Sequence, residues 1–144
     1  MEKWQEELKD KKFRIFVYGT LKKGESNHHF LSNAKYICDD VINGYELYDL
    51  PYGFPCIVKG KGDIYGEVYE VNIVDLFRVN ALEGFREPFE CVDNSLYDRD
   101  KVNPKISEEP AYVYVMKQVP NCGAIKLKDG MWNKLINISN YLTR

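Results

Sequence analysis

Strand-like runs follow one another along most of this 144-residue chain, and only one segment has a clear helical period. That segment covers residues 73–82, where Leu76, Val79 and Leu82 are spaced three residues apart. Asn72 stands before it as an acceptable N-cap. Runs of β-branched and aromatic residues predict strands at 13–18, 35–38, 41–48, 64–71, 88–92 and 111–116. Because strands mostly follow strands, we predict an α+β fold with a mixed or closed, largely antiparallel sheet and helices packed on it, rather than a doubly wound sheet.

The chain length predicts one domain over residues 1–144, since domains usually hold about 100–200 residues. Residues 1–12 are highly charged and form a polar N-terminal extension. Asp39-Asp40 is expected to separate two strands, as is Asn43-Gly44 further along. Residues 98–110 are polar and lack periodicity, so we expect a surface loop there.

The charge balance excludes some function classes. The chain has 20 basic and 22 acidic residues, a net charge of −2, so it lacks the basic field that drives non-specific binding to nucleic acid. The uncharged runs are far shorter than the roughly 20 apolar residues of a membrane helix, and residues 1–12 lack the apolar core of a secretory signal. We therefore expect no nucleic-acid partner, no membrane association and a cytoplasmic protein.

The cysteines and histidines do not suggest a metal centre. The four cysteines lie far apart without a CxxC pair, and the two histidines, His28 and His29, are adjacent. Zinc sites need closer ligand spacing, so we predict no metal site. A nucleophile–base pair between a cysteine and His28 or His29 is a weaker interpretation than a double histidine in a solvated loop.

The segment Tyr18-Gly19-Thr20-Leu21 places a glycine at the end of the first predicted strand. Successive backbone amides in such a turn can form an anion-binding concavity, and glycine allows a ligand to approach closely. An ordinary strand-ending turn is the competing interpretation. The loop is not a P-loop, because Gly24 is not followed by lysine and a hydroxyl residue.

Glu83 follows the apolar helical stripe and precedes Gly84, so the helix is expected to end there. A carboxylate at a helix C-terminus faces the negative end of the helix dipole, and together with partial burial this raises its pKa toward the range useful for proton transfer. A solvated surface glutamate is the competing interpretation, and Glu87 and Glu90 are nearby rivals.

Four segments together resemble the γ-glutamylcyclotransferase-like superfamily, most closely its γ-glutamylamine cyclotransferase branch and bacterial relatives. The resemblance extends over about residues 13–132. The segments are residues 17–24 with Asn27 and Leu31 after them, residues 66–71, Leu82-Glu83-Gly84, and residues 111–114.

The resemblance implies a small mixed β-barrel with flanking helices and a pocket in which Tyr18, Gly19, Thr20, Leu21 and Tyr114 bind substrate. It implies that Glu83 is the catalytic acid/base. The reaction would be intramolecular aminolysis of a γ-glutamyl amine or γ-glutamyl amino acid, giving 5-oxoproline and a free amine without metal or cofactor.

Three departures from the family pattern bear on the substrate more than on the fold. They are Asn80 in place of an acid, Phe89-Glu90-Cys91 after the Glu-Gly, and a late Asp129-Gly130-Met131-Trp132. A non-catalytic binding module for an anionic metabolite is the alternative function. A magnesium-dependent nucleotide hydrolase is less favoured, because the required acidic spacing is missing. The sequence does not indicate the released amine or the oligomeric state.

Overall fold

The computed structural model describes residues 11–84 and 97–142, and in these ranges the chain forms one mixed sheet with helices packed on it. Six strands are hydrogen-bonded in the order β4-β5-β1-β3-β2-β6. Their bounds are Phe13–Val17 (β1), Lys35–Asp49 (β2), Pro55–Val71 (β3), Tyr97–Val102 (β4), Ala111–Met116 (β5) and Ile125–Lys126 (β6). The helical segments are η1 (His28–Leu31), α2 (Ile73–Gly84) and α3 (Lys134–Tyr141).

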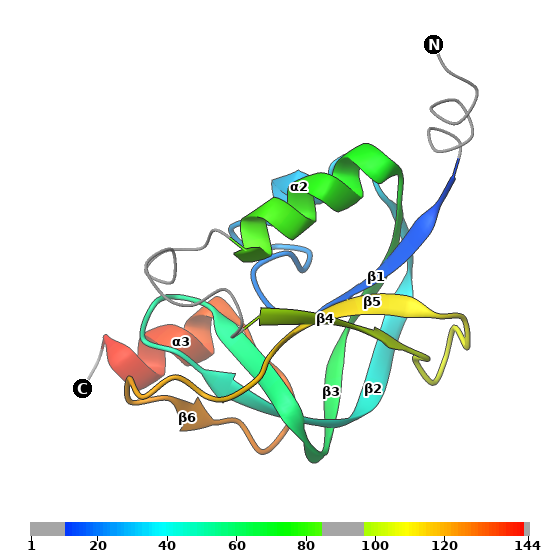
Figure 1. Ribbon diagram of the computed structural model, residues 1–144. Coiled ribbons are helices and arrows are strands. Elements are labelled where there is room, and N and C mark those ends of the chain that lie inside the picture. Colours follow the sequence, from blue (N-terminus) through cyan, green and yellow to red (C-terminus); the bar gives the residue numbers. More distant parts are fainter. Residues whose placement is uncertain (1–10, 85–96, 143–144) are drawn as a thin grey trace.

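The sheet curls into a half-barrel (Figure 1). The long strands β2 and β3 form an antiparallel hairpin, β1 pairs antiparallel with β3, and β4 pairs antiparallel with β5. The parallel pair is β1 with β5, where Ile15 is opposite Tyr112. The predicted α+β class and largely antiparallel mixed sheet are confirmed.

The two faces of the sheet are covered by different apolar clusters, because side chains alternate along each strand. Ile15 and Val17 of β1 pack with Leu76 and Val79 of α2. Phe16, between them on β1, packs in the other cluster with residues of β2, β3, β5 and Trp132. The end of β1 is therefore held from both sides.

The helix predicted at 73–82 is confirmed and extends to Gly84. The Asn72 side chain accepts a hydrogen bond from the backbone N–H of Asp75 at 2.8 Å, as expected of an N-cap. The apolar positions Leu76 and Val79 are buried, whereas Val74 and Phe77 are exposed. The apolar side of α2 therefore packs against the sheet, and the opposite side is exposed.

Two expectations about strand breaks were wrong. Residues 35–49 form one continuous strand, in which the register shifts between Tyr36 and Cys38 and between Asn43 and Tyr45. Bulges of this kind bend a strand without ending it. Residues 98–102 of the loop predicted at 98–110 belong to strand β4, because hydrogen bonds to β5 stabilise a polar segment that has no apolar pattern of its own.

Asp49 fixes α3, which the sequence analysis did not predict. The carboxylate is fully buried and accepts hydrogen bonds from Trp132 Nε1 and Asn137 Nδ2, both at 2.8 Å, and from Asn140 Nδ2 at 2.9 Å. The Asp49 carbonyl accepts another from the Tyr141 hydroxyl at 2.6 Å. The short helix α3 is thus held to the end of β2 by both the carboxylate and the backbone carbonyl of Asp49.

Asp40 is a second buried carboxylate with structural donors around it. Its oxygens accept hydrogen bonds from the backbone N–H groups of Val41 and Ile106 at 2.8 Å and of Ser107 at 2.9 Å. Burial disfavours its ionised form, but the three donors outweigh burial and hold the pKa of Asp40 below its ordinary value of 3.8. Asp40 therefore anchors the segment after β4 to β2.

The depressed pKa predicts that this anchor stabilises the fold above about pH 4 and is lost as the pH falls through the folded-state pKa. We expect Asp40→Asn to lower the free energy of unfolding at pH 7 by about 2 kcal/mol, the size of hydrogen bonds to a charged group. Urea unfolding at pH 7 and pH 3 measures this. The gap between Asp40→Asn and wild type should narrow at pH 3, and Asp98→Asn on the exposed edge strand is the control. A gap that is the same at both pH values would contradict this account.

Candidate active site

The turn that follows β1 is tightly held. The N–H of Lys22 donates to the Gly19 carbonyl at 3.1 Å, and the N–H of Asn27 donates to the Thr20 carbonyl at 2.8 Å. The Asn27 side chain also donates to Thr20 Oγ1 at 2.9 Å. Asn27 thus braces this turn rather than capping η1 with its side chain.

One pocket opens at this turn. The residues lining it are Phe16, Val17, Tyr18, Gly19, Thr20, Leu21, Pro55 and Tyr114. All five residues predicted to bind substrate, Tyr18 to Leu21 and Tyr114, therefore meet at one place. The Tyr18 hydroxyl donates to the Tyr114 carbonyl at 2.7 Å, which ties the two sides of the pocket together. Their role as substrate ligands stays a prediction.

Pro55 is a pocket residue that the sequence analysis missed. A Cβ added at Gly19 would lie 2.8 Å from both Cγ and Cδ of the Pro55 ring. The glycine is therefore required at least for the close approach of the turn to the start of β3. The two segments are 36 positions apart, and no local pattern indicates that they meet.

Lys22 anchors the turn to the C-terminal part of the chain. Its ammonium group donates to the Trp132 carbonyl. Burial lowers the pKa of Lys22, while the acidic side chains of Glu67, Glu25 and Asp39 oppose that shift. Trp132 is itself buried and bonded to Asp49. Residues 129–132, the late segment that departs from the family pattern, thus help to hold Lys22 and the turn in place.

Gly130, in the same late segment, allows this segment to lie against β3. It has a φ of +70°, and a Cβ there would collide with the Asp63 carbonyl. Its own carbonyl accepts a hydrogen bond from the N–H of Tyr65 at 2.9 Å. A side chain at position 130 would separate the segment from the sheet.

His28 and His29 also serve the turn. Nδ1 of His28 lies 2.9 Å from the Leu21 carbonyl, and Nδ1 of His29 lies 3.2 Å from the Ser26 carbonyl. The His28 ring packs against Tyr69, with ring centroids 5.7 Å apart. Both histidines therefore make contacts within the loop, and His28 is half-buried rather than solvated as expected. These contacts favour a structural role over a nucleophile–base pair.

Glu83 lies in the last turn of α2, immediately before the terminal Gly84. The apolar face of this helix packs in the same cluster as Leu21 and Leu31, which follow the pocket turn. The backbone thus brings the end of α2 to the side of the sheet that carries this turn (Figure 1). The side chains of Asn80 and Glu83 lie outside the described residues, as do the rivals Glu87 and Glu90 and the departure at 89–91.

Within residues 11–84 and 97–142, no three His, Cys, Asp or Glu side chains gather where a metal ion could be held. No helix in these ranges is long and apolar enough to cross a membrane. Cys38, Cys56 and Cys122 are free thiols.

Comparison with known proteins identifies the family to which this chain is similar. The family model described as "Gamma-glutamyl cyclotransferase, AIG2-like" matches residues 15–134. The Escherichia coli protein YtfP, named a γ-glutamylcyclotransferase family protein, is 32% identical over 119 residues, which cover 83% of this chain and 95% of YtfP. γ-Glutamylaminecyclotransferase A of Danio rerio is 37% identical over 116 residues, covering 69% of this chain and 66% of that protein.

PH0828 from Pyrococcus horikoshii is similar in both sequence and structure. It is 48% identical over 77 residues, which cover 52% of this chain and 63% of PH0828. Its crystal structure superimposes with a TM-score of 0.67 at 30% identity, over 92% of this chain and 99% of that one. Residues 15–134, which the family model matches, contain the pocket turn, α2 and β5. The chain belongs to the γ-glutamyl cyclotransferase, AIG2-like family.

Proposed function

We propose that this protein is a γ-glutamylcyclotransferase, which converts a γ-glutamyl amine or γ-glutamyl amino acid into 5-oxoproline and the free amine. The observation that carries the proposal is the pocket at the end of β1, where Tyr18 to Leu21 and Tyr114 meet. The helix that bears Glu83 packs beside the same turn. A small polar substrate bound in this pocket would therefore lie beside the helix that carries Glu83, the proposed proton carrier.

The geometry of the turn supports recognition of an anion by backbone amides. The carbonyls of Gly19 and Thr20 are engaged inside the turn by Lys22 and Asn27. In a planar trans peptide the N–H points opposite to the carbonyl, so the N–H groups of Thr20 and Leu21 point out of the turn. We propose that these two N–H groups donate hydrogen bonds to the α-carboxylate of the glutamyl group or to the oxyanion that develops on its γ-carbonyl.

The reaction needs only proton transfer and positioning. The α-amine of the substrate attacks its own γ-carbonyl carbon, a new C–N bond closes the five-membered ring, and the original amide C–N bond breaks. The α-ammonium loses two protons as it becomes the ring N–H, and the leaving nitrogen gains two as it departs as an ammonium ion. Glu83 relays these protons one after the other, accepting each as the carboxylate and returning it to the leaving nitrogen as the acid. No water is consumed. The bound conformation brings the amine within reach of the carbonyl, and this contributes through proximity.

The test is to incubate the purified chain, with EDTA present throughout, with several γ-glutamyl amines and γ-glutamyl amino acids and to quantify 5-oxoproline by mass spectrometry. We expect 5-oxoproline and the free amine in equal amounts from at least one compound. Binding of 5-oxoproline or glutamate without any turnover would favour the non-catalytic binding module. Activity that is lost in EDTA and restored by magnesium would support a metal-dependent hydrolase.

A further inference from the structure

Glu67 lies beside the end of β1, where the pocket turn begins. In the β1–β3 register it is paired with Val17, the last residue of β1. Directly opposite residues of a sheet share a face, and so do residues two apart on one strand. Val17 and Tyr69 both pack in the apolar cluster that contains the buried residues of α2. The Glu67 side chain therefore projects on the α2 side of the sheet, next to the pocket turn.

The Glu67 carboxylate binds the backbone of this turn. Its Oε1 accepts a hydrogen bond from the N–H of Lys23 at 2.9 Å. The N–H groups of Lys22 and Glu25 bond within the turn instead, to the carbonyls of Gly19 and Lys22 at 3.1 and 3.0 Å. The hydrogen bond from Lys23 thus leaves the turn and ties its backbone to β3.

The charge of Glu67 also acts on Lys22, the residue before Lys23. Burial lowers the pKa of the Lys22 ammonium, and Glu67 opposes that shift more than the other acidic side chains around it do. Glu67 thereby favours the charged form of Lys22, which donates to the Trp132 carbonyl. One carboxylate therefore holds two successive residues of the turn, Lys23 through its backbone and Lys22 through its charge.

Tyr69 holds the carboxylate in this position. Its side chain is buried, and its hydroxyl donates to Oε1 of Glu67 at 2.9 Å. Burial first, and then the hydrogen bond to Glu67, raise the pKa of Tyr69, so the hydroxyl remains a donor at neutral pH. The Tyr69 ring packs against His28, whose Nδ1 lies 2.9 Å from the Leu21 carbonyl. Tyr69 thus supports the turn at a second point.

We propose that Glu67 is a positioning residue of the candidate active site, which holds the pocket turn in the conformation that presents the N–H groups of Thr20 and Leu21 to the substrate. The described residues that line the pocket do not include Glu67, so it acts through the turn and not on the substrate. The inference rests on the proposed function, in which these two N–H groups bind an anion. It adds a carboxylate outside the pocket on which that binding depends.

The physical reason is preorganisation. Backbone donors bind an anion strongly when they already point at its position, because the loop then does not have to be ordered during binding. Lys23 is exposed, so without Glu67 its N–H can bond to water instead. The turn would then adopt further conformations, in which the N–H groups of Thr20 and Leu21 no longer converge on the ligand.

Two substitutions of Glu67 test the inference. Glu67→Met keeps the length of the side chain but removes the oxygen acceptor, whereas Glu67→Gln keeps an amide oxygen that can accept both hydrogen bonds. We expect Glu67→Met to weaken 5-oxoproline binding at least about fivefold in calorimetry and to raise KM for a γ-glutamyl substrate similarly, with kcat within about twofold of wild type. Glu67→Gln should recover part of both losses.

Tyr69→Phe is a second variant that keeps the test decisive if Glu67→Met does not fold. It retains the aromatic ring and removes only the hydroxyl that donates to Oε1 of Glu67. We expect a smaller loss of affinity for 5-oxoproline, about two- to threefold, in a protein that unfolds as wild type does. Affinity that is unchanged in Tyr69→Phe would count against the carboxylate as the group that holds the turn.

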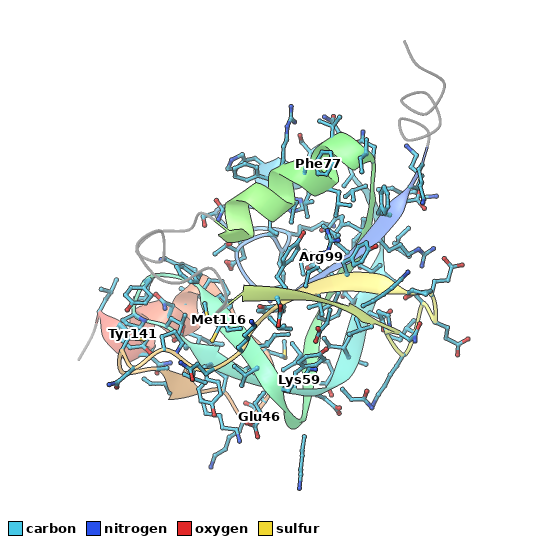
Figure 2. All side chains as sticks on the ribbon, in the orientation of Figure 1. Glu46, Lys59, Phe77, Arg99, Met116 and Tyr141 are labelled. Atoms are coloured by element: carbon cyan, nitrogen blue, oxygen red, sulfur yellow. The ribbon has the colours of Figure 1, made fainter. Side chains whose placement is uncertain are left out.

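The matched control is Glu46→Met, which removes a half-buried carboxylate of β2 that pairs with Lys126 at 3.1 Å. Figure 2 shows Glu46 at the end of the sheet remote from α2. With thermal unfolding measured in parallel, this variant should bind 5-oxoproline as wild type does. An equal loss in Glu46→Met, or unchanged binding and kinetics in Glu67→Met, would overturn the inference.

Two further outcomes are distinguishable from these. Turnover lost equally in Glu67→Gln and Glu67→Met, with 5-oxoproline binding unchanged in both, would overturn the inference, because an amide cannot replace a carboxyl group that transfers protons. If wild type neither binds 5-oxoproline nor releases it from any γ-glutamyl compound, the proposed function itself has failed, and this inference fails with it.

Discussion

Glu83→Gln is expected to lower turnover of γ-glutamyl substrates by at least about 10²-fold, the lower end of what a positioned acid/base contributes. The amide cannot accept the proton from the α-ammonium or return it to the leaving nitrogen. Since glutamine has nearly the same shape, the variant should fold and bind substrate as wild type does. Steady-state kinetics of 5-oxoproline release, with thermal unfolding and calorimetric binding of 5-oxoproline in parallel, measures each of these.

The matched comparisons for Glu83 are the neighbouring glutamates and a distant one. Glu87→Gln and Glu90→Gln should retain most of the activity. Glu46→Gln removes a carboxylate of β2 that pairs with Lys126 of β6, and it should have no effect on turnover. If Glu83→Gln is as fast as wild type and Glu87→Gln is inactive, the assignment of the proton carrier is wrong.

The second large effect is expected at Gly19. A side chain at this position enters the space of the Pro55 ring, with carbon–carbon distances of 2.8 Å for the first atom alone. Neither the proline ring nor the hydrogen-bonded turn can move without changing the pocket that they share. Overpacking of this kind costs about 1–3 kcal/mol of folding stability. Because the overlap is relieved by displacing the turn, we expect Gly19→Val also to weaken 5-oxoproline binding, by about 10- to 100-fold.

A rescue experiment separates this collision from a general folding defect. Gly19→Ala introduces only the Cβ, and Pro55→Ala removes the two ring atoms that it would meet. Calorimetry should show weaker binding in Gly19→Ala and a partial recovery in the double variant, with thermal unfolding confirming that each protein is folded. Affinity for 5-oxoproline that is unchanged in Gly19→Val would count against the turn as the anion-binding element.

The sequence predicts the elements next to the pocket well, because their patterns are local. The first strand is a continuous β-branched and aromatic run, and β1 covers Phe13–Val17 as expected. The helix after Asn72 has both an N-cap and an apolar stripe, and each is present in the structure. Strand β5 is likewise found at Ala111–Met116. Periodicity and capping suffice for such segments.

Other elements depend on partners distant in the chain, and local patterns do not reveal them. Strand β4 is polar, and its backbone pairing with β5 is what stabilises it as a strand. Strand β2 continues through Asp39 and Asp40 because its partner β3 remains paired beside it and the Asp40 carboxylate finds three backbone donors. The short helix α3 depends on Asp49, more than 80 residues earlier. None of these reasons is visible within a window of ten residues.

The residues of the candidate site are likewise of two kinds, those with a local signal in the sequence and those without one. The pocket turn and Glu83 stand out in the sequence because a glycine follows a strand and a glutamate ends an apolar helix. Pro55 and Lys22 have no such signal, since their contacts with Gly19 and Trp132 are made only in three dimensions.

The central claim, that the γ-glutamyl amide is broken by the substrate's own amine and not by water, is tested most directly by turnover in ¹⁸O-labelled water. Ring closure retains the γ-carbonyl oxygen and consumes no water, so the account predicts 5-oxoproline without ¹⁸O, formed in equal amount with the free amine. Glutamate that carries one ¹⁸O in its γ-carboxylate as the first product would contradict the account and identify the protein as a hydrolase.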